Sequence, residues 1–535
     1  MHTTTRPHDL RVGDGQPVQW AAAYARDLAG EAVYADPAPE RRAARVLAAF
    51  ILTGLAFLAL PGTLLGVWNL ITIASRHTSS AASAAWIQAH GQAQLFGWVG
   101  TFILGISLYV LPKFQGRMPR RFGLAWTVWG LWTLGVGLRW WAGLGTRFWQ
   151  VGLVVSGILE ILALILTVYF TAFARPTDAP RRKPKRPGDL GSWMGMVGFA
   201  ALGVALAVNL AIAVSVARAS ALPVYPAVSD REFLTIALWG FAVPMAWGYS
   251  TRFVTVFLSL PQPIHSAWRW LSAGIIAVVA ASLARQFFLA DALALLLTLA
   301  AIGALKVFRP SLRPPKTASI YRHYPAFVRI SYVWLAVGAA LGVLADTFTS
   351  QVGLTGASRH AVTVGFLATL IFAIGPRLLP SFLNGRELYS STLMAASLWI
   401  LNVGCFLRVS SEAVAYSLGG AAWSVLPVSA LLELAAVILF VVNLGLTLKQ
   451  PLPAWFEPDE VNETLPVYWY VTSYPGTRSL LVRAGLKTLG RVHDVPRSLT
   501  LAEAAAADNV GIDGLLEQLR EFFSRRQPRR VGRSA

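Results

Sequence analysis

The sequence predicts an all-α polytopic membrane protein, a bundle of transmembrane helices followed by a small helical module. Three observations lead to this fold class. Only 13% of the 535 residues are charged while 55% are hydrophobic, and a soluble globular chain carries about 25% charged residues. Apolar segments recur that are long enough to cross a bilayer, which needs about 20 residues per helix. Basic residues gather in alternate connecting loops, as in proteins that follow the positive-inside rule.

Twelve apolar segments between residues 45 and 448 meet this length, and we expect each to be a transmembrane helix. The preceding residues 1–44 are polar, show no cleavable signal peptide and are expected in the cytoplasm. The expected spans lie near residues 45–73, 83–112, 122–142, 149–173, 192–217, 231–260, 268–286, 289–308, 326–347, 357–382, 391–409 and 424–448.

Loop charge predicts the orientation of these helices. The loops after the second, fourth and eighth spans are the most basic, and the one after the fourth span reads ARPTDAPRRKPKRPGD. This asymmetry places both termini in the cytoplasm and indicates a protein of the bacterial inner (cytoplasmic) membrane. The net charge of +20 therefore reflects orientation in the lipid bilayer, and we exclude nucleic-acid binding. The single cysteine, Cys405, excludes a disulfide or a thiolate cluster within this chain.

The character of the chain changes after about residue 449, where charged, water-compatible sequence begins. The stretch SLTLAEAAAADNVGIDGLLEQLREFFSRR predicts two short helices, with Ser498 or Thr500 capping the first and Glu503 completing a capping box. We expect a small cytoplasmic helical module at 465–525 with an unknown cytoplasmic partner, and a basic disordered tail at 526–535.

An internal repeat relates the beginning of the membrane domain to its end. The offsets are 360 − 90 = 270 for two histidines, 380 − 112 = 268 for two prolines and 433 − 160 = 273 for two glutamates. The middle copy, GFAVPMAWGYSTRFVTVF, is weaker. We therefore predict three pseudo-repeated units of four helices.

His90 and His360 are the first candidate site residues, because each lies in the outer part of a span that runs inward. Their distances from Pro112 and Pro380 place them at depths that differ by only about 3 Å. A single intramembrane histidine is equally consistent with a polar residue bonded to a neighbouring helix, but the matched pair favours the two axial ligands of one haem. Positions 90, 94, 97, 101, 105 and 108 form a stripe that includes Gln94 and small residues, which suits a porphyrin plane or close helix packing.

A copper site requires further imidazoles, and the sequence does not offer them in the membrane. The other histidines are expected in loops or tails, so a three-histidine copper site is not predicted and copper is doubtful. They are His2, His8, His77, His265, His323 and His493.

Charged residues inside the spans are the remaining candidates. Glu160 and Glu433 lie near mid-membrane, where they either hydrogen-bond between helices as neutral groups or form part of a proton path. Four arginines near outer ends either pair with haem propionates or extend to the headgroups. These four are Arg139, Arg285, Arg359 and Arg408.

These segments resemble those of a known family. HGQAQLFGWVGTFILGISLYVLP is distantly similar to the second helix of haem–copper oxidase subunit I. Together with LWGFAVPMAWGYSTRF and HAVTVGFLATLIFAIGPR, it is more similar to the NnrS family of membrane haem and copper proteins linked to nitric oxide and nitrosative stress. The resemblance spans about residues 45–448 and implies a b-type haem held by His90 and His360. Gln92 and Thr251 stand where the family often has histidines, which weighs against copper.

The C-terminal region carries a second resemblance. The stretch from PGTRSLLVRAG to LEQLREFF is similar to a helical module of hybrid-cluster and iron–sulfur repair proteins, without the usual cysteine.

Three functions remain open from the sequence. The first is a haem-binding NnrS-type protein in nitric oxide metabolism or the nitrosative stress response, served by a membrane or periplasmic electron donor. The second is a haem-free secondary transporter that uses Glu160 and Glu433. The third is a respiratory-type nitric oxide or oxygen reductase subunit, which the missing copper histidines disfavour. Whether the protein is an oxidoreductase stays open.

Overall fold

The computed structural model describes residue 19, residues 38–450 and residues 461–524, with short gaps in both ranges. The gaps are 115–116, 119–121, 146, 173–174, 177–188, 313–320, 322, 352, 383–387, 474–475, 492–494 and 496–497. The expected tail at 526–535 and most of the expected N-terminal segment lie outside the described residues. Two compact units are present, of which the larger comprises Arg45–Leu379 and Leu388–Thr447.

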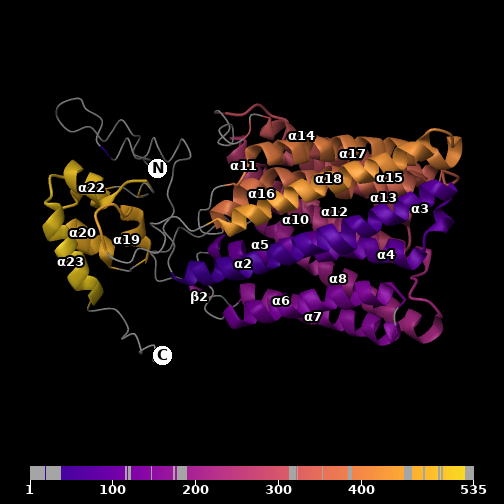
Figure 1. The fold of residues 1–535 in the computed structure, drawn as a ribbon, viewed down its shortest axis with the longest axis horizontal. Helices are drawn as coiled ribbons and strands as arrows, with labels where there is room; N and C mark the ends of the chain where they lie inside the picture. The colour runs from indigo at the N-terminus through magenta and orange to yellow at the C-terminus, as the bar shows by residue number, and fades with distance from the viewer. Residues whose placement is uncertain are drawn as a thin grey trace. The chain divides into compact units, whose positions relative to one another are not determined.

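The larger unit is a bundle of long helices that run side by side (Figure 1). In chain order the membrane helices are α2 (Ala38–Phe57), η2 (Leu58–Leu64), α3 (Leu65–Arg76), η3 (Ser79–Ala81), α4 (Ala84–Gln92), η4 (Ala93–Gly100), α5 (Thr101–Phe114), α6 (Phe122–Gly143), α7 (Trp149–Ala172), α8 (Leu190–Ala219), α9 (Ala227–Thr235), η5 (Ile236–Ala242), α10 (Val243–Ser250), α11 (Phe253–Phe257), η6 (His265–Ala267), α12 (Trp268–Leu283), α13 (Phe287–Leu305), α14 (Tyr324–Thr347), α15 (Gly353–His360), η7 (Ala361–Ala368), α16 (Thr369–Phe382), α17 (Ser391–Leu418) and α18 (Ala422–Lys449).

Within the described part of the chain, eleven helical stretches are long and apolar enough to cross a membrane. The expected span near 122–142 corresponds to α6, a helix rich in tryptophan and glycine that is not among these eleven. The all-helical fold class is confirmed, while the arrangement as three units of four helices stays a prediction. One span is longer than expected, because α17 continues to Leu418 although the apolar run ends near residue 409. Helical backbone can persist through a polar sequence at a membrane surface, where hydropathy no longer marks its end.

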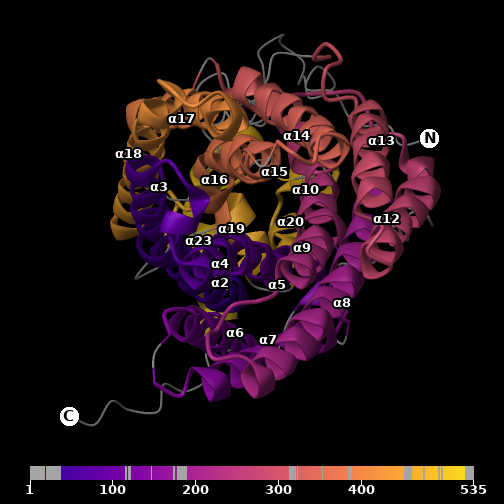
Figure 2. The same cartoon turned by 90° about the vertical axis from the view of Figure 1, so that its right-hand side faces the viewer.

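Three spans form the inside of the bundle. In their most apolar windows, 89% of residues are buried in Ala84–Pro112, 83% in Ala227–Phe257 and 72% in Gly353–Leu379, against 33–50% in the other eight. Viewed end-on, α4, α9, α10, α15 and α16 lie inside an arc made by α6, α7, α8, α12, α13, α14, α17 and α18 (Figure 2). Each inner span contains a π-helical stretch, η4, η5 or η7, and such stretches are frequent at functional sites.

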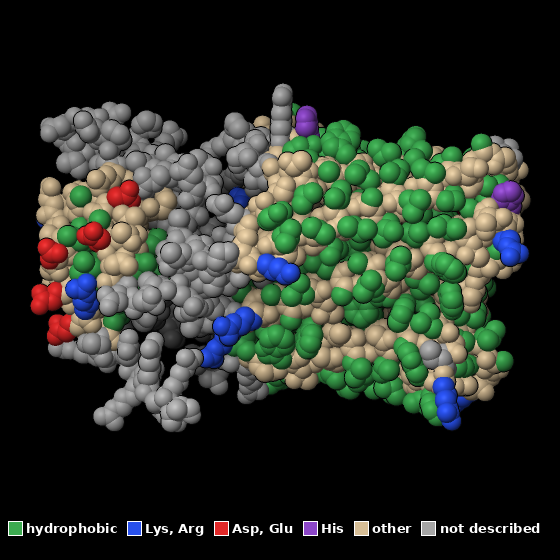
Figure 3. Space-filling model, in the orientation of Figure 1, with side chains coloured by type: hydrophobic (Ala, Val, Ile, Leu, Met, Phe, Trp, Pro, Cys, Tyr) green, Lys and Arg blue, Asp and Glu red, His purple; other side chains and the backbone are tan. Residues whose placement is uncertain are grey.

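The face of this unit shown in Figure 3 is covered by hydrophobic side chains, with charged side chains visible only toward its two ends. Many leucines, valines and tryptophans of this unit are exposed, among them Leu60, Trp68, Val151 and Leu296. A soluble monomer seldom exposes so continuous an apolar surface. The protein is therefore a multi-pass membrane protein.

Polar contacts at the ends of the helices hold the bundle together. Asp189 caps α8 by accepting hydrogen bonds from the backbone N–H and the hydroxyl of Ser192, and it pairs with Arg252 at 2.9 Å. Burial opposes its charge, but these donors outweigh burial and hold the pKa of Asp189 below its usual value. The short strands β1 (Arg117–Met118) and β2 (Arg175–Pro176) pair antiparallel beyond the ends of α5 and α7.

Residues 461–524 contain five short helices around their own hydrophobic core. These are α19 (Val467–Ser473), α20 (Thr477–Arg483), α21 (Lys487–Arg491), α22 (Leu501–Ala507) and α23 (Ile512–Ser524). Thr500, rather than Ser498, makes the capping box with Glu503. Tyr470 lies in the core and donates to the Asn462 carbonyl at 2.6 Å, and burial raises the pKa of its hydroxyl.

Candidate functional site

A cavity of about 380 Å³ lies inside the larger unit and is lined mainly by the three inner spans together with α3, α17 and α18. Its wall is largely apolar, with Trp98, Phe233 and Phe372 among the aromatic residues. Most of the residues singled out from the sequence meet at this cavity. His90, Gln94, Arg139, Arg359, His360, Arg408 and Glu433 all line it.

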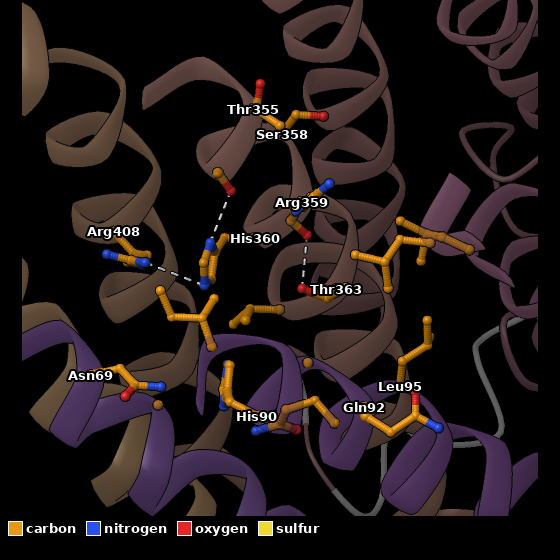
Figure 4. Close-up of a pocket in the computed structure, with 18 of the residues that line it drawn as sticks. Asn69, His90, Gln92, Leu95, Thr355, Ser358, Arg359, His360, Thr363 and Arg408 are labelled. Carbon is orange, nitrogen blue, oxygen red and sulfur yellow. Dashed lines mark hydrogen bonds between the residues drawn. The ribbon is translucent and has the colours of Figure 1, made fainter. Parts of the chain in front are cut away.

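His90 and His360 enter the cavity from opposite walls, His90 from α4 and His360 from α15 (Figure 4). The Nδ1 atom of His90 lies 2.8 Å from the carbonyl oxygen of Gly62 in the π-helical stretch η2. A methyl group on Gly66 would lie only 2.5 Å from Cε1 of His90, so the imidazole packs directly over this glycine. No described residue hydrogen-bonds Nε2 of His90, which leaves that nitrogen available to a ligand.

The His360 ring is held by three groups. Its Nδ1 lies 2.9 Å from the Gly356 carbonyl oxygen and 3.2 Å from Oε2 of Glu412. Its Nε2 lies 3.5 Å from Nη2 of Arg408, a long contact drawn as a dashed line in Figure 4. Because two acceptors face Nδ1 and a donor faces Nε2, the network favours the tautomer with its proton on Nδ1. That tautomer leaves the Nε2 lone pair directed away from the backbone, as a metal-ligating histidine requires.

Glu412 is a site residue that sequence reasoning missed. It is 7% exposed, lines the cavity and pairs with Arg408 at 3.3 Å as well as with His360. The expected span ended near residue 409, which left Glu412 in a loop. The signal that identifies it is its spacing from Arg408, since residues four apart share one face of a helix.

The four candidate arginines separate into two groups. Arg139 is 2% exposed, lies over the Tyr225 ring at 4.4 Å and has no partner among the described residues for Nε or Nη1. Arg408 likewise has no described partner for Nη1. Arg359 lines the cavity, whereas Arg285 is outside it and pairs with Glu232. Three of the four therefore supply cationic groups to the cavity.

The stripe of small residues after His90 serves helix packing. Gln94 faces the cavity and donates to Thr63 at 3.1 Å. A methyl group on Gly97 would meet Phe57 at 2.8 Å, and one on Gly105 would meet Phe50 at 2.5 Å. The interpretation of this stripe as space for a porphyrin is therefore wrong for Gly97 and Gly105, which pack against neighbouring side chains. The π-helical stretch η4 changes the number of residues per turn, so a constant helical period does not describe which face these residues share.

The two intramembrane glutamates differ in their access to the cavity. Glu433 lines it, whereas Glu160 is 0% exposed and lies behind its wall. Glu160 connects to the cavity through Gln92, whose amide donates to Oε1 at 3.4 Å. Neither Oε2 of Glu160 nor Oε1 of Glu433 has a partner among the described residues.

A second charged cluster, also missed in the sequence, borders the cavity from α9, α13 and α14. Nη2 of Arg231 lies 2.9 Å from Asp291 and 2.6 Å from Asp346, and the guanidinium covers the Phe287 ring at 4.4 Å. Asp230 and Asp291 are part of the cavity wall. Each of these residues is close to the end of an apolar run, where a charge is expected at the headgroups, so sequence alone does not separate them from surface anchors.

Among the described residues, no group of three or more histidines, cysteines, aspartates or glutamates is arranged to hold a metal ion. A site for iron in a porphyrin needs only one imidazole on each face.

The architecture resembles that of a solved membrane-protein structure. A solved structure described as a cryo-EM structure of a heme-copper terminal oxidase dimer superposes with a TM-score of 0.59 and 11% sequence identity, covering 90% of this chain and 98% of that one. At this identity the likeness shows the fold alone. Fold and site thus define a polytopic helical membrane protein with haem–copper-oxidase-like architecture and a histidine-flanked internal cavity.

The chain belongs to the NnrS family. The family model described as "NnrS protein" matches residues 45–451, which include every residue of the cavity wall. No functionally curated protein matches the sequence. The family and the fold together indicate a membrane protein of the haem-binding type.

Proposed function

We propose that the protein binds one b-type haem between His90 and His360 and acts in nitric oxide metabolism or the nitrosative stress response. The observation that carries the haem proposal is the pair of imidazoles on opposite walls of one cavity, each with Nδ1 tied to a carbonyl oxygen. Such bonds orient a ligating histidine and make it a better donor to iron. The nitric oxide assignment rests on family membership.

The residues of the cavity fit a haem in two further ways. The mostly apolar wall suits a macrocycle, and Arg139, Arg359 and Arg408 offer guanidinium groups to its carboxylates. The open nitrogens of Arg139 and Arg408 are costly to bury unless an acceptor reaches them. A bis-histidine haem, when bound, supplies one-electron redox chemistry.

The test is an absorption spectrum of the purified, detergent-solubilised protein. We expect a reduced-minus-oxidised haem spectrum in the wild type and its loss in both His90→Ala and His360→Ala. His323→Ala is the matched control, because this histidine is exposed and does not line the cavity. A spectrum unchanged in both cavity variants refutes the ligand assignment, and protein that neither contains nor takes up haem favours the transporter alternative.

The nitric oxide proposal has a separate test in cells. We expect a strain without this gene to grow more slowly under nitric oxide, with growth restored by the wild-type gene and by His323→Ala but not by His90→Ala. Equal growth of the deletion strain and its parent under nitric oxide overturns this part and leaves the haem proposal intact. We further propose an inner-membrane location with cytoplasmic termini, which a reporter fused to either end can test.

A further inference from the structure

Two glutamates near the cavity lie in corresponding surroundings. A methyl group on Gly135 of α6 would lie 2.9 Å from Cγ of Glu160, and one on Gly404 of α17 would lie 3.1 Å from Cγ of Glu433. Each glycine is four residues before a cavity arginine, in GVGLR and GCFLR. The offsets 404 − 135 = 269 and 408 − 139 = 269 agree with the repeat that relates the two glutamates. The same packing arrangement, a glutamate over a glycine one turn from an arginine, therefore occurs twice.

The charges around the cavity indicate which carboxyl groups are neutral. Four arginines line the wall, and four aspartate or glutamate carboxylates other than Glu160 and Glu433 equal them in number, although two of these carboxylates pair with Arg231. Glu160 and Glu433 remain as additional acidic groups, and neither forms an ion pair within the described part of the chain. An isolated ionised carboxylate in a membrane interior is very costly, so such groups persist as the protonated acid. The four arginines are Arg139, Arg231, Arg359 and Arg408, and the balancing carboxylates are Asp230, Asp291, Asp346 and Glu412.

Glu160 and Glu433 differ in whether the arginine near them already has a carboxylate partner. Arg408, the arginine near Glu433, forms an ion pair with Glu412 at 3.3 Å. Arg139 has no carboxylate within ion-pair distance among the described residues, although it interacts electrostatically with Glu160. If Glu160 loses its proton, Arg139 is thus the available counter-charge.

The hydrogen bonds of Glu160 show where its proton resides. Oε1 accepts from the Gln92 amide, so the carboxyl proton belongs on Oε2, the oxygen without a described partner. The groups that face this carboxyl are Gln92 from α4, Arg139 from α6 and Tyr225 from the segment before α9, while α8 packs on α7 through the apolar Leu210. One water accepting from both Oε2–H and Arg139 would satisfy the open donors, since a buried water bonds two to four polar groups.

We propose that Glu160 is the proton-holding residue of the cavity, storing one proton as a neutral acid and donating it to water on the Arg139 side. In this step the Oε2–H bond breaks, the proton passes to the water, and the carboxylate that remains is stabilised by Arg139. Arg139 lines the cavity, so a molecule bound there can receive the proton. This inference goes beyond the proposed function and does not depend on haem.

Infrared spectroscopy of the full-length protein in lipid tests it directly. We expect a protonated carboxyl C=O band in the wild type that shifts on transfer from H₂O to D₂O, because water reaches Glu160. Glu160→Gln should lose the part of this band that belongs to Glu160, while the part that belongs to Glu433 stays. Glu232→Gln is the matched control, since it makes the same chemical change at a glutamate paired with Arg285 outside the cavity. An unchanged carboxyl band in Glu160→Gln, or a loss in the carboxylate region instead, overturns the proposal.

A second variant probes the role of the amide. Gln92→Leu removes the donor to Oε1, and a C=O group that loses a hydrogen bond stretches at higher frequency. We expect the Glu160 band to move up in this variant, whereas a purely structural role of Gln92 would leave it in place. If Glu160→Gln does not fold, Glu433→Gln labelled with ¹³C-glutamate decides the question, because Glu160 is then the remaining glutamate that the charge count leaves neutral. A carboxyl band that does not respond to this label contradicts the assignment.

Discussion

Gly66 allows a sharp test of the position of His90. A methyl group at residue 66 would lie 2.5 Å from Cε1 and 2.8 Å from Nδ1 of His90. Ordinary van der Waals contact begins at 3.4 Å, so Gly66→Ala must displace the ring by 3.4 − 2.5 = 0.9 Å. A displacement of this size breaks the 2.8 Å contact between Nδ1 and the Gly62 carbonyl oxygen.

The lost hydrogen bond alone is worth about 0.5–1.5 kcal/mol, which corresponds to roughly a 2- to 13-fold weaker haem affinity. The shift also moves Nε2 away from the position in which it would bind the haem iron, so this range of affinity loss is a lower bound. Titration of haem into the haem-depleted protein measures the dissociation constant. Gly130→Ala is the matched control, because no atom lies within 4 Å of its added methyl group, and alanine should raise helix stability by about 0.5–1 kcal/mol. Equal haem affinity in Gly66→Ala, Gly130→Ala and the wild type refutes the role of His90 as a ligand.

Three further predictions follow from the described contacts. Glu412→Gln removes the carboxylate beside Nδ1 of His360, and we expect haem affinity to fall about 10- to 100-fold, as for other partners of metal-ligating histidines; an unchanged titration would contradict this. Asp189→Ala should destabilise the protein by about 0.5–2 kcal/mol through loss of the α8 cap, with a smaller loss in Asp189→Asn, measured by thermal unfolding in detergent. The pKa of Asp189 is lower in the folded protein than in the unfolded chain. The stability that its charge contributes should therefore persist as pH falls to about 3.9, the unfolded pKa, and vanish below the folded pKa. A loss of this stability near neutral pH would contradict the assignment. Thr500→Ala removes the capping box and should lower the stability of α22 by about 1 kcal/mol. We expect faster hydrogen exchange of the α22 amides in the full-length chain. Identical exchange would show that tertiary packing alone holds this helix.

The membrane class and most of the spans follow from sequence because hydrophobicity is local. A segment such as Trp149–Ala172 is apolar over most of its length, with Glu160 as its one charged residue, and no other part of the chain is needed to assign it. The depth of His90 and His360 in the membrane stays a prediction, made from the count of residues along each helix. The C-terminal end of α17 could not be predicted, because its last turns are polar and hydropathy does not mark where such a helix ends.

The side-chain directions depend on how the helices rotate and pack. Arg139, Arg285, Arg359 and Arg408 are alike in sequence context, yet three line the cavity and Arg285 pairs with a neighbouring helix. The π-helical stretches add to this uncertainty, because one altered turn redirects every residue after it.

Sequence alone determined that this chain is a helical membrane protein, since that property follows from local hydrophobicity, and counting along the helices predicted two histidines at one depth. Only the tertiary structure decided that these histidines share one cavity, that Glu412 holds His360, and that Glu160 lies behind the wall beside Gln92. These contacts join helices far apart in the chain, and their geometry depends on packing that no single segment encodes.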